Sequence, residues 1–464
     1  MIEKKYSYFY FMIGFIFLFF FNGRYILPLA AFLAPAFLIR FLRFQKPLKG
    51  FLMLLLAFWI SNIFIWQDML PMSGLFYYFL MFMFGVPIAL IFLIDKLFTN
   101  KIKSIISTLV FPSAYVIFEY MTIYLNPSGS YGSLAHTQSN LVLLQIVSVT
   151  GIWGLIFIIT WIPSMINWLW DSAFERKRLK SAFLVCIIPI LFIILFGQIR
   201  LSINSNSETV MVASIIADNY GDGANSDFLF RSENAAKAGA KIIFGSENSI
   251  QLNESEETEF IEKAQEIAIN NNVYIGLPIQ KIFDFSLLQK KVIWISPLGE
   301  ILFTYYKSKP TTGEGDYGNG KIQYFDSIYG RIGSVICFDL DFPSLISQVS
   351  EMDIDIMLIP GNDWYEISPY HTYVGSMRSI EYGFNQVRTV SKGLSASFNY
   401  KGEVLSTLDD FHTEDSTMYS NVPINGQSTI YSLLGDYFAW MCFVVLSVLT
   451  TIYFSHSKKK SKTL

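Results

Sequence analysis

The chain has 464 residues, of which 52% are hydrophobic, 17% aromatic and only 15% charged. Soluble domains carry about 25% charged residues, so this composition excludes a protein that is water-soluble throughout. The formal net charge of −3 is close to neutral and argues against nucleic acid as a partner. The three cysteines and four histidines lack the spacing of a zinc site, and we expect no metal.

Eight apolar runs approach or exceed the roughly 17–25 residues that span a bilayer as a helix. They lie near 6–22, 25–42, 50–66, 74–94, 104–124, 141–169, 181–199 and 430–455. Lys and Arg gather in the loops 40–49, 96–103 and 176–180 and at both chain ends, whereas the alternate loops 67–74 and 126–140 contain neither. Because basic loops stay in the cytoplasm, this pattern predicts eight spans with both termini cytoplasmic.

The pattern divides the chain into three predicted parts. A seven-helix membrane region covers 1–199, an extracytoplasmic domain covers 200–429, and an eighth helix with a basic tail covers 430–464. In the middle part, strand-like runs lie near 210–216, 241–245, 273–277, 291–295, 301–306, 335–336, 353–359, 387–390, 395–398 and 404–408, and helical stretches near 232–239, 256–270 and 372–383. This alternation predicts an α/β domain in which helices cover a sheet.

Three reactive side chains follow apolar strands in this domain. They are Glu247, Lys307 and Cys337. Taken one at a time, each residue has an ordinary structural explanation. Cys337 is explained as a thiol packed in the core, Glu247 as a solvated acid in a loop, and Lys307 as the end of a hairpin. Active sites in α/β sheets lie beyond strand ends, where a carboxylate can take a thiol proton and an ammonium can stabilise an oxyanion. Together the three predict a nucleophilic site.

Glu119 lies within the fifth apolar run. A carboxylate inside a membrane helix is costly and is usually paired or functional. The alternative is a position near the outer interface, where water solvates the carboxylate.

The three strand ends resemble the motifs of the nitrilase superfamily. The matching segments are Gly245-Ser-Glu247, Tyr305-Tyr-Lys307 and Val335-Ile-Cys337, in the order that the superfamily has them. The resemblance covers about 209–425 and implies an α-β-β-α sandwich with Glu247, Lys307 and Cys337 as catalytic triad. Glu314 then falls where the superfamily has a second, supporting glutamate. Residues 361–364, His371, 377–381, Arg388 and 400–403 also follow the superfamily pattern.

The membrane part is similar to the apolipoprotein N-acyltransferase family of bacteria. Residues 130–138, 144–146 and 151–154 carry this resemblance, together with Glu119. It implies a multi-pass protein of the bacterial cytoplasmic membrane, with its catalytic domain on the outer face. The implied reaction moves an acyl chain from a membrane phospholipid, through a thioester on Cys337, to the N-terminal amine of a diacylglyceryl-apolipoprotein. No cofactor is implied.

Departures from the family motifs leave the acyl acceptor open. The family has Tyr and Glu after the cysteine, where this chain has Phe338 and Asp339, and the loop after Trp364 is short. We expect Phe338 and Asp339 to support the site, and Trp364 and Glu119 to bind substrate or to belong to a loop of the site. Residues 311–314 are closer to soluble nitrilases, which keeps a membrane-anchored nitrilase or amidase-type hydrolase as the alternative. A polytopic transporter or receptor is a further alternative.

Overall fold

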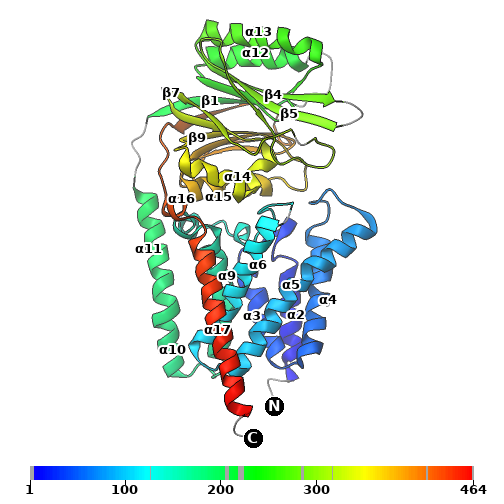
Figure 1. Cartoon of the computed structure of the whole chain (residues 1–464), viewed down its shortest axis with the longest axis vertical. Helices are drawn as coiled ribbons and strands as arrows, with labels where there is room; N and C mark the ends of the chain where they lie inside the picture. The colour runs from blue at the N-terminus through cyan, green and yellow to red at the C-terminus, as the bar shows by residue number, and fades with distance from the viewer. Residues whose placement is uncertain are drawn as a thin grey trace. The chain divides into compact units, whose positions relative to one another are not determined.

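The computed structural model (Figure 1) describes residues 5–125, 127–203, 208–217, 224–283, 287–315, 317–413 and 416–461. The chain forms two compact units. One, here called the helical unit, comprises Met1–Asn126, Gly132–Ser202 and Leu434–Leu464. The other, the sheet unit, comprises Pro127–Tyr131 and Ile203–Leu433. A short segment between two helices of the helical unit therefore belongs to the sheet unit.

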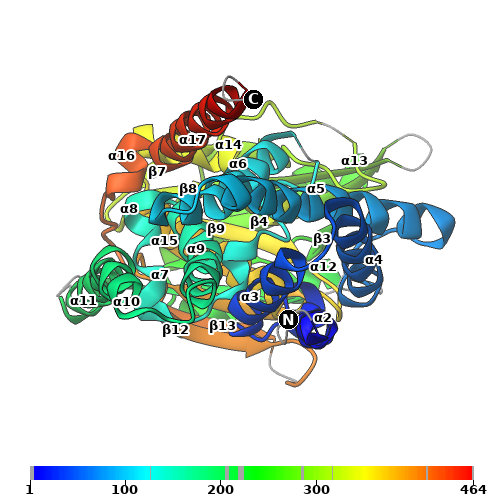
Figure 2. The same cartoon turned by 90° about the horizontal axis from the view of Figure 1, so that it is seen from below.

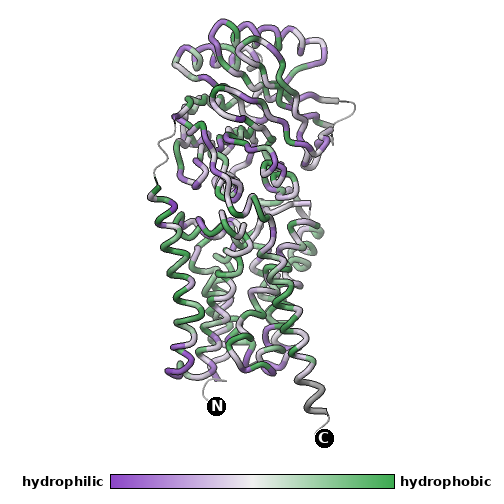
Figure 3. Tube along the Cα trace, turned by 60° about the vertical axis from the view of Figure 1, so that its left-hand side comes forward, coloured by the Kyte–Doolittle hydropathy of each residue, from purple (hydrophilic) through white to green (hydrophobic). Residues whose placement is uncertain are grey.

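The helical unit is a bundle in which α9 packs against both α3 and α6 (Figure 2). Hydrophobic residues dominate its helices along their length (Figure 3), as the composition requires. Its helices are α2 (Ser7–Leu18), η1 (Gly23–Tyr25), α3 (Ala30–Arg43), α4 (Pro47–Ile65), α5 (Gly74–Lys101), η2 (Ile105–Leu109), α6 (Val110–Leu125), η3 (Leu134–Thr137), α7 (Leu141–Leu144), α8 (Val147–Thr150), α9 (Ile152–Trp170), α10 (Arg176–Ala182), η4 (Phe183–Ile187), α11 (Ile188–Ser202) and α17 (Tyr437–Ser461), with α16 (Ile430–Leu434) leading into the last.

Six helices of the described residues are long and apolar enough to cross a membrane. They are Pro47–Ile65, Gly74–Lys101, Ile105–Leu125, Ile152–Trp170, Arg176–Ser202 and Tyr437–Ser455, and each falls on a predicted run. In the first two predicted runs, α2 has 12 residues and α3 has 14. At 1.5 Å per residue they rise about 18 and 21 Å, less than the roughly 30 Å hydrocarbon core. The count of eight spans and their sidedness therefore stay predictions.

Glycines with positive φ set two helix starts that the apolar pattern placed too early. Gly151 has φ +63° and separates the short helix α8 from α9, so the long helix begins at Ile152. Gly435 has φ +59° and α17 begins at Tyr437. A hydropathy pattern does not detect these breaks, because apolar residues continue on both sides of the glycine whose conformation ends the helix.

The described residues of the sheet unit form two sheets. The first has the strand order β13-β1-β2-β4-β5-β6, with β3 beside β4, and the second has the order β12-β11-β10-β9-β8-β7. The strands are β1 (Thr209–Ile215), β2 (Ile242–Gly245), β3 (Ile250–Gln251), β4 (Tyr274–Phe283), β5 (Leu287–Ile295), β6 (Ile301–Tyr306), β7 (Gln323–Ser327), β8 (Gly330–Ser334), β9 (Ile356–Asn362), β10 (Asn385–Ser391), β11 (Leu394–Phe398), β12 (Val404–Asp409) and β13 (Thr417–Pro423).

Helices cover the outer face of each sheet, which gives an α-β-β-α sandwich (Figure 1). Helices α12 (Ala224–Lys237) and α13 (Glu254–Asn271) pack on the first sheet, and α15 (Tyr370–Tyr382) packs on β10 and β11 of the second. The short helix α14 (Pro343–Ile346) lies between β8 and β9 in the chain. Two 3-10 helices, η6 (Cys337–Asp341) and η7 (Ser347–Glu351), flank α14. The α/β nitrilase-like fold class is thereby confirmed for this unit.

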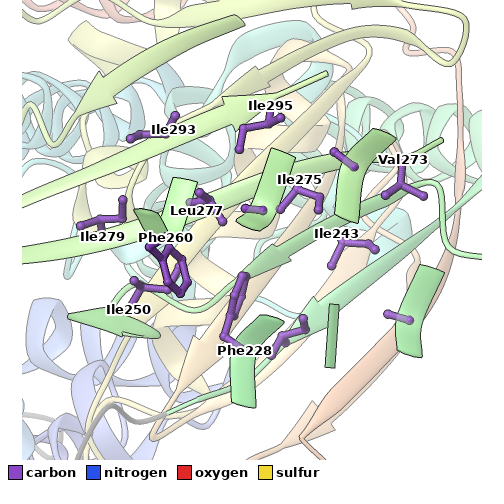
Figure 4. Close-up of a cluster of buried hydrophobic side chains, with 14 of the residues drawn as sticks. Phe228, Ile243, Ile250, Phe260, Val273, Ile275, Leu277, Ile279, Ile293 and Ile295 are labelled. Carbon is purple, nitrogen blue, oxygen red and sulfur yellow. The ribbon is translucent and has the colours of Figure 1, made fainter. Parts of the chain in front are cut away.

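Side-chain alternation explains how the first sheet binds its helices. Ile275, Leu277 and Ile279 of β4 lie two residues apart and point to one face, where Phe228 of α12 and Phe260 of α13 meet them in a buried cluster (Figure 4). The opposite face packs on the second sheet. There the Trp294 ring of β5 lies 5.7 Å from the Phe325 ring of β7, centroid to centroid.

The sequence pattern placed most strands within a few residues and missed three. The missed strands are β3, β7 and β13. Val335 and Ile336 were expected as strand, but β8 ends at Ser334 and its partner register with β9 ends there too. β13 lies antiparallel to β1 at the edge of the first sheet, a pairing of distant segments that no local pattern encodes.

Candidate active site

The three predicted reactive residues come from both sheets. Glu247 follows β2 and Lys307 follows β6 in the first sheet, whereas Cys337 follows β8 in the second. A backbone hydrogen bond from Glu247 N to Gly361 O (3.1 Å) joins the β2 end to β9 across the sandwich. The structure therefore brings these strand ends to one place.

Glu247 lies in a buried cluster of four charges. Lys307 Nζ donates to Glu247 Oε1 (2.8 Å) and lies 2.8 Å from Glu314 Oε2. Lys290 Nζ lies 3.0 Å from Glu247 Oε1 and 2.8 Å from Glu314 Oε1. Each ammonium therefore contacts both carboxylates, and each of the four side chains is less than a tenth exposed. A cluster of two carboxylates and two ammoniums is neutral as a whole, which offsets the cost of burying its charges.

The cluster keeps its members ionised. Burial raises the pKa of Glu247, but the ammoniums of Lys290 and Lys307 outweigh it and hold this pKa at about 2. Burial lowers the pKa of Lys307, yet the negative charges beside it, Glu247 first, raise the pKa well above its ordinary value. The same balance lowers the pKa of Glu314 and raises that of Lys290.

Cys337 occupies a strained position at the start of η6. It has φ +50°, in the left-handed region that non-glycine residues seldom adopt, and its side chain is buried. Its thiol lies 3.8 Å from the carbonyl oxygen of Asn362, to which it donates. Burial and the negative charge of Glu247 raise the thiol pKa to about 12, against the opposing charges of Lys307 and Arg388. The resting group is therefore a thiol that needs a base when it reacts.

Asp339 ties the lysine segment to the cysteine segment. Its fully buried carboxylate accepts hydrogen bonds from Ser308 N (3.1 Å), Lys309 N (2.6 Å) and Ile336 N (3.1 Å). The hydroxyl of Tyr305 donates a further bond of 2.7 Å. Asp339 thus acts as a clamp between the segments that carry Lys307 and Cys337.

A second buried network adjoins the thiol. His371 of α15 lies between two carboxylates, with Nδ1 2.8 Å from Asp363 Oδ1 and Nε2 2.8 Å from Asp341 Oδ2. Arg388 Nη2 lies 2.9 Å from the same oxygen of Asp363. Burial and Arg388 lower the pKa of His371, but the two carboxylates outweigh them and raise it to about 9.

The thiol, imidazole and carboxylate of this network lie close enough to suggest metal ligands. One ligand atom from each of Cys337, Asp363 and His371 falls within 4.8 Å of the others. However, Arg388 is bound to Asp363, and a protonated His371 is itself a cation. Two positive charges at this point oppose a metal ion, so the residues fit an internal ion-pair network better.

The remaining predicted residues are not members of the four-charge cluster. Phe338 is half-buried and packs edge-on against Phe342, with ring centroids 5.1 Å apart. Trp364 follows β9 and is 37% exposed. Glu119 belongs to α6 of the helical unit, where its buried carboxylate accepts hydrogen bonds from Ser133 Oγ (2.5 Å) and Leu134 N (2.9 Å). In that unit Glu119 is paired, and it anchors the start of η3.

Lys290 is the residue of the cluster that sequence reasoning missed. It lies within β5, and most of the residues that flank it along this strand are apolar. Its backbone carbonyl accepts a hydrogen bond from Lys307 N (3.0 Å). A lysine inside an apolar strand was the available signal. The adjacent Lys291 points to the other face of the strand and pairs with Glu257 (2.6 Å).

With this geometry described, comparison with known proteins decides the family. A model of the carbon–nitrogen hydrolase family matches residues 207–438. The chain belongs to this family. A second model, that of the apolipoprotein N-acyltransferase N-terminal domain, matches residues 13–165. Together the two matches cover both the helical and the sheet part of the chain, which places it in the membrane-embedded apolipoprotein N-acyltransferase branch of the carbon–nitrogen hydrolases.

Curated relatives match along most of this carbon–nitrogen hydrolase. Apolipoprotein N-acyltransferase of Rickettsia typhi is 23% identical over 70% of this chain and 73% of its own length. That of Rickettsia prowazekii is 23% identical over 79% and 81%, and that of Haemophilus influenzae is 22% identical over 76% of each. The solved amidase of Nesterenkonia sp. is 12% identical over 48% of this chain and 94% of its own, with a TM-score of 0.40, a likeness too weak to support an inference. The predicted family is confirmed, and the catalytic triad stays a prediction.

Proposed function

We propose that this enzyme moves a fatty acyl chain from a membrane phospholipid to the N-terminal amine of diacylglyceryl-cysteine on apolipoproteins, with Cys337 as the covalent carrier. It is an acyltransferase of lipoprotein maturation by its family, since the two family models and the curated relatives agree. The observation that carries the proposed chemistry is the contact of Lys307 with Glu247 and Glu314 beside a buried, strained Cys337.

In the proposed first half-reaction, Glu247 takes the proton from the Cys337 thiol as Sγ attacks the ester carbonyl carbon of the phospholipid. Because the pKa of the thiol lies far above that of Glu247, this proton moves together with C–S bond formation and not before it. Lys307 stabilises the oxyanion of the tetrahedral intermediate. The carbon–oxygen bond to the glycerol then breaks, the leaving oxygen takes the proton from Glu247, and a lysophospholipid departs from the thioester.

In the proposed second half-reaction, the amine of diacylglyceryl-cysteine attacks the thioester carbonyl. Glu247 takes a proton from the attacking nitrogen, Lys307 again stabilises the oxyanion, and the C–S bond breaks. The proton returns to sulfur, and the products are an amide on the lipoprotein and the free thiol. No step in this sequence needs a metal or another cofactor.

The neighbours of the triad have positioning roles in this proposal. Glu314 and Lys290 hold Glu247 and Lys307 in place through the four-charge cluster. Asp339 fixes the distance between the lysine and cysteine segments. Phe338 supports the site through its ring contact with Phe342, and the exposed Trp364 is the aromatic residue that we expect to meet an acyl or acceptor group.

The predicted location fits these substrates. The protein is a multi-pass protein of the bacterial inner membrane, as its apolar helices and its relatives support. We infer cytoplasmic termini and a catalytic unit on the outer face from the basic loops. Both the phospholipid donor and the diacylglyceryl acceptor are anchored in a bilayer, so a catalytic unit carried by membrane helices can receive both.

Acyl-enzyme formation tests the proposed nucleophile. The full-length protein in detergent is incubated with a phospholipid that carries a labelled acyl chain, and the label on protein is measured by intact-mass spectrometry. We expect one hydroxylamine-labile acyl group on the native protein and on the control Cys186→Ala, whose thiol is buried in the helical unit. Cys337→Ala should carry none, and full labelling of that variant would overturn the assignment.

The fate of the thioester separates transfer from the alternative, hydrolysis. The acylated enzyme is freed of lipid and divided between buffer alone and buffer with a diacylglyceryl-cysteine peptide. We expect the acyl group to persist in buffer and to appear as an amide on the peptide. Rapid release of free fatty acid in both samples would instead identify a membrane-anchored hydrolase.

A further inference from the structure

The helical unit contains a cavity of about 400 Å³ that the proposed function does not use. Its lining comes from the ends of helices: Arg40 and Arg43 of α3, Asp171 after α9, and Arg178 of α10. Lys103, between α5 and η2, completes the charged lining. This volume lies in the range of small-ligand pockets, about 300–1,000 Å³. Four cations and one carboxylate therefore surround a space that can hold a small anionic group.

Internal ion pairs do not balance this positive charge. Arg40 Nη1 lies 2.8 Å from Asp171 Oδ1, and Arg43 Nη2 lies 3.2 Å from Asp95 Oδ2, just behind the lining. Within the described part of the chain, neither Lys103 nor Arg178 pairs with a carboxylate. Four cations against two carboxylates leave a net charge of about +2 around a partly buried space, and charges there are screened little by salt.

The pocket also holds polar atoms that lack partners. Nε of Arg43 and Oγ of Ser164 are buried and have no hydrogen-bond partner among the described residues. Ser164 is 1% exposed and lines the cavity. Buried donors without acceptors cost free energy, which a ligand rich in oxygen acceptors would recover.

Helix capping accounts for only part of this cluster. Basic side chains at helix C-termini can satisfy free carbonyls. At the end of α3, Lys96 from α5 already does so, because its Nζ donates to Leu42 O (2.6 Å). At the end of α9, Arg178 Nη1 donates to Trp168 O (2.9 Å) and leaves its other nitrogens available. Helix capping therefore does not account for the side chain of Lys103 or for the remaining guanidinium nitrogens of Arg178.

The surroundings favour a lipid as the source of the anion. The guanidinium of Arg178 lies over the ring of Trp168 at 4.7 Å and that of Arg40 over Trp170 at 4.8 Å, the aromatic and basic pairing of a membrane interface. Farther along the same segment, Leu179, Phe183 and Leu184 line a second cavity of about 430 Å³ together with Arg176 and Lys180. Apolar surface beside cations suits an acyl chain next to a headgroup.

We propose that the pocket of Arg40, Arg43, Lys103 and Arg178 binds the phosphate-bearing headgroup of an anionic phospholipid. By the predicted topology this lipid belongs to the cytoplasmic leaflet, so it is distinct from the acyl donor. Basic pockets between transmembrane helices on that side are suited to such headgroups. The proposal rests on the helical unit alone and does not depend on the proposed acyl transfer.

Lipid binding to the full-length protein tests it. The native protein, Lys103→Gln/Arg178→Gln and the control Lys177→Gln are delipidated in a neutral detergent. Lys177 lies on α10 next to Arg178, is exposed and does not line the pocket. Binding of phosphatidylglycerol, phosphatidylcholine and inorganic phosphate is measured by native mass spectrometry and thermal unfolding. Lipid bound at the catalytic site contributes equally to all three proteins.

We expect the native protein and Lys177→Gln to retain phosphatidylglycerol more tightly than phosphatidylcholine. The double variant should bind phosphatidylglycerol about 30-fold more weakly, since each basic contact is worth about a factor of five. Equal binding of both lipids by the native protein would overturn the proposal even if the variant failed to fold. So would unchanged binding by a folded variant. Stabilisation by inorganic phosphate but not by phosphatidylglycerol would show a free-anion pocket and overturn the lipid assignment.

Discussion

The ammonium of Lys290 lies 3.0 Å from Oε1 of Glu247, the oxygen that also accepts from Lys307. A single carboxylate oxygen thus faces two cations in a buried place. This relationship explains why Glu247 has a pKa of about 2 despite its burial. It also sets how strong a base Glu247 can be, because each ammonium that stabilises the carboxylate reduces its affinity for a proton.

Lys290→Met should therefore raise the pKa of Glu247. An opposite charge at this distance lowers a carboxyl pKa by about 1–3 units, so its loss should move the acidic limb of kcat/KM upward by a similar amount. The measurement is the pH dependence of lipopeptide acylation from pH 2 to 8, which includes the native limb near pH 2 and the expected limb of the variant at about pH 3–5. Lys290→Arg keeps a cation and should restore the native profile.

Lys291→Met is the matched control for Lys290. Lys291 is the next residue of β5, but it pairs with Glu257 on the other face of the strand. Its replacement should leave the acidic limb unchanged. If Lys290→Met lowered kcat but left the acidic limb of kcat/KM at its native pH, the electrostatic role would be contradicted. Lys290 would then have only a structural role.

The position of Lys290 also marks where sequence reasoning stops. The ends of β2 and β6 could be located, and that of β8 to within two residues, because apolar runs stop abruptly before Glu247, Lys307 and Cys337. Lys290 lies inside a strand, and only the pleat decides whether it faces Glu247 or solvent. Because Lys290 and Lys291 are adjacent, a register shift of one residue would exchange their partners.

The same limit applies to Asp339 and to the second network. From the sequence, Asp339 is only a substitution for the glutamate that the family has at this position. In the structure its carboxylate accepts four hydrogen bonds, which join the lysine segment to the cysteine segment. Asp341, Asp363 and His371 are separated by up to 30 residues, and only the packing of α15 on the second sheet joins them. Apolar periodicity predicts that the helix and sheet exist, but not which polar groups meet between them.

Glu247→Gln should slow acyl-enzyme formation. The amide keeps the shape of the side chain but cannot take the thiol proton, and a positioned general base contributes about 10²–10⁴-fold. The measurement is the burst rate of label transfer from phospholipid to protein. Glu257→Gln, a carboxylate of the sheet unit that pairs with Lys281 and Lys291, serves as control and should react at the native rate. A native burst rate in Glu247→Gln would exclude it as the base.

Asp339→Asn should destabilise the sheet unit. In the variant, an amide nitrogen replaces one carboxylate oxygen that accepts hydrogen bonds, so at least one of the four donors loses its acceptor. An unsatisfied buried polar group lowers the free energy of unfolding by about 1–3 kcal/mol. For a unit of this size, we expect the apparent melting temperature to fall by about 3–10 °C. Asp326→Asn removes an exposed carboxylate paired with Arg331 and should change the melting temperature little. Equal melting temperatures for Asp339→Asn and the native protein would show that the clamp contributes nothing to stability.

His371 should make the stability of the protein depend on pH in the alkaline range. Its pKa is about 9 in the folded protein, above the value of about 6.5 expected when unfolded, so the charged form stabilises the fold. This contribution is fully present below about pH 6.5 and is lost as pH rises through 9; a difference of this size corresponds to about 3 kcal/mol. We expect the melting temperature of the native protein to fall between pH 7 and 9.5, and that of His371→Gln to fall less. His412→Gln, which alters an exposed histidine paired with Asp409, should follow the native curve. Parallel curves for the native protein and His371→Gln would mean that the Asp341–His371–Asp363 contacts do not depend on a charged imidazole.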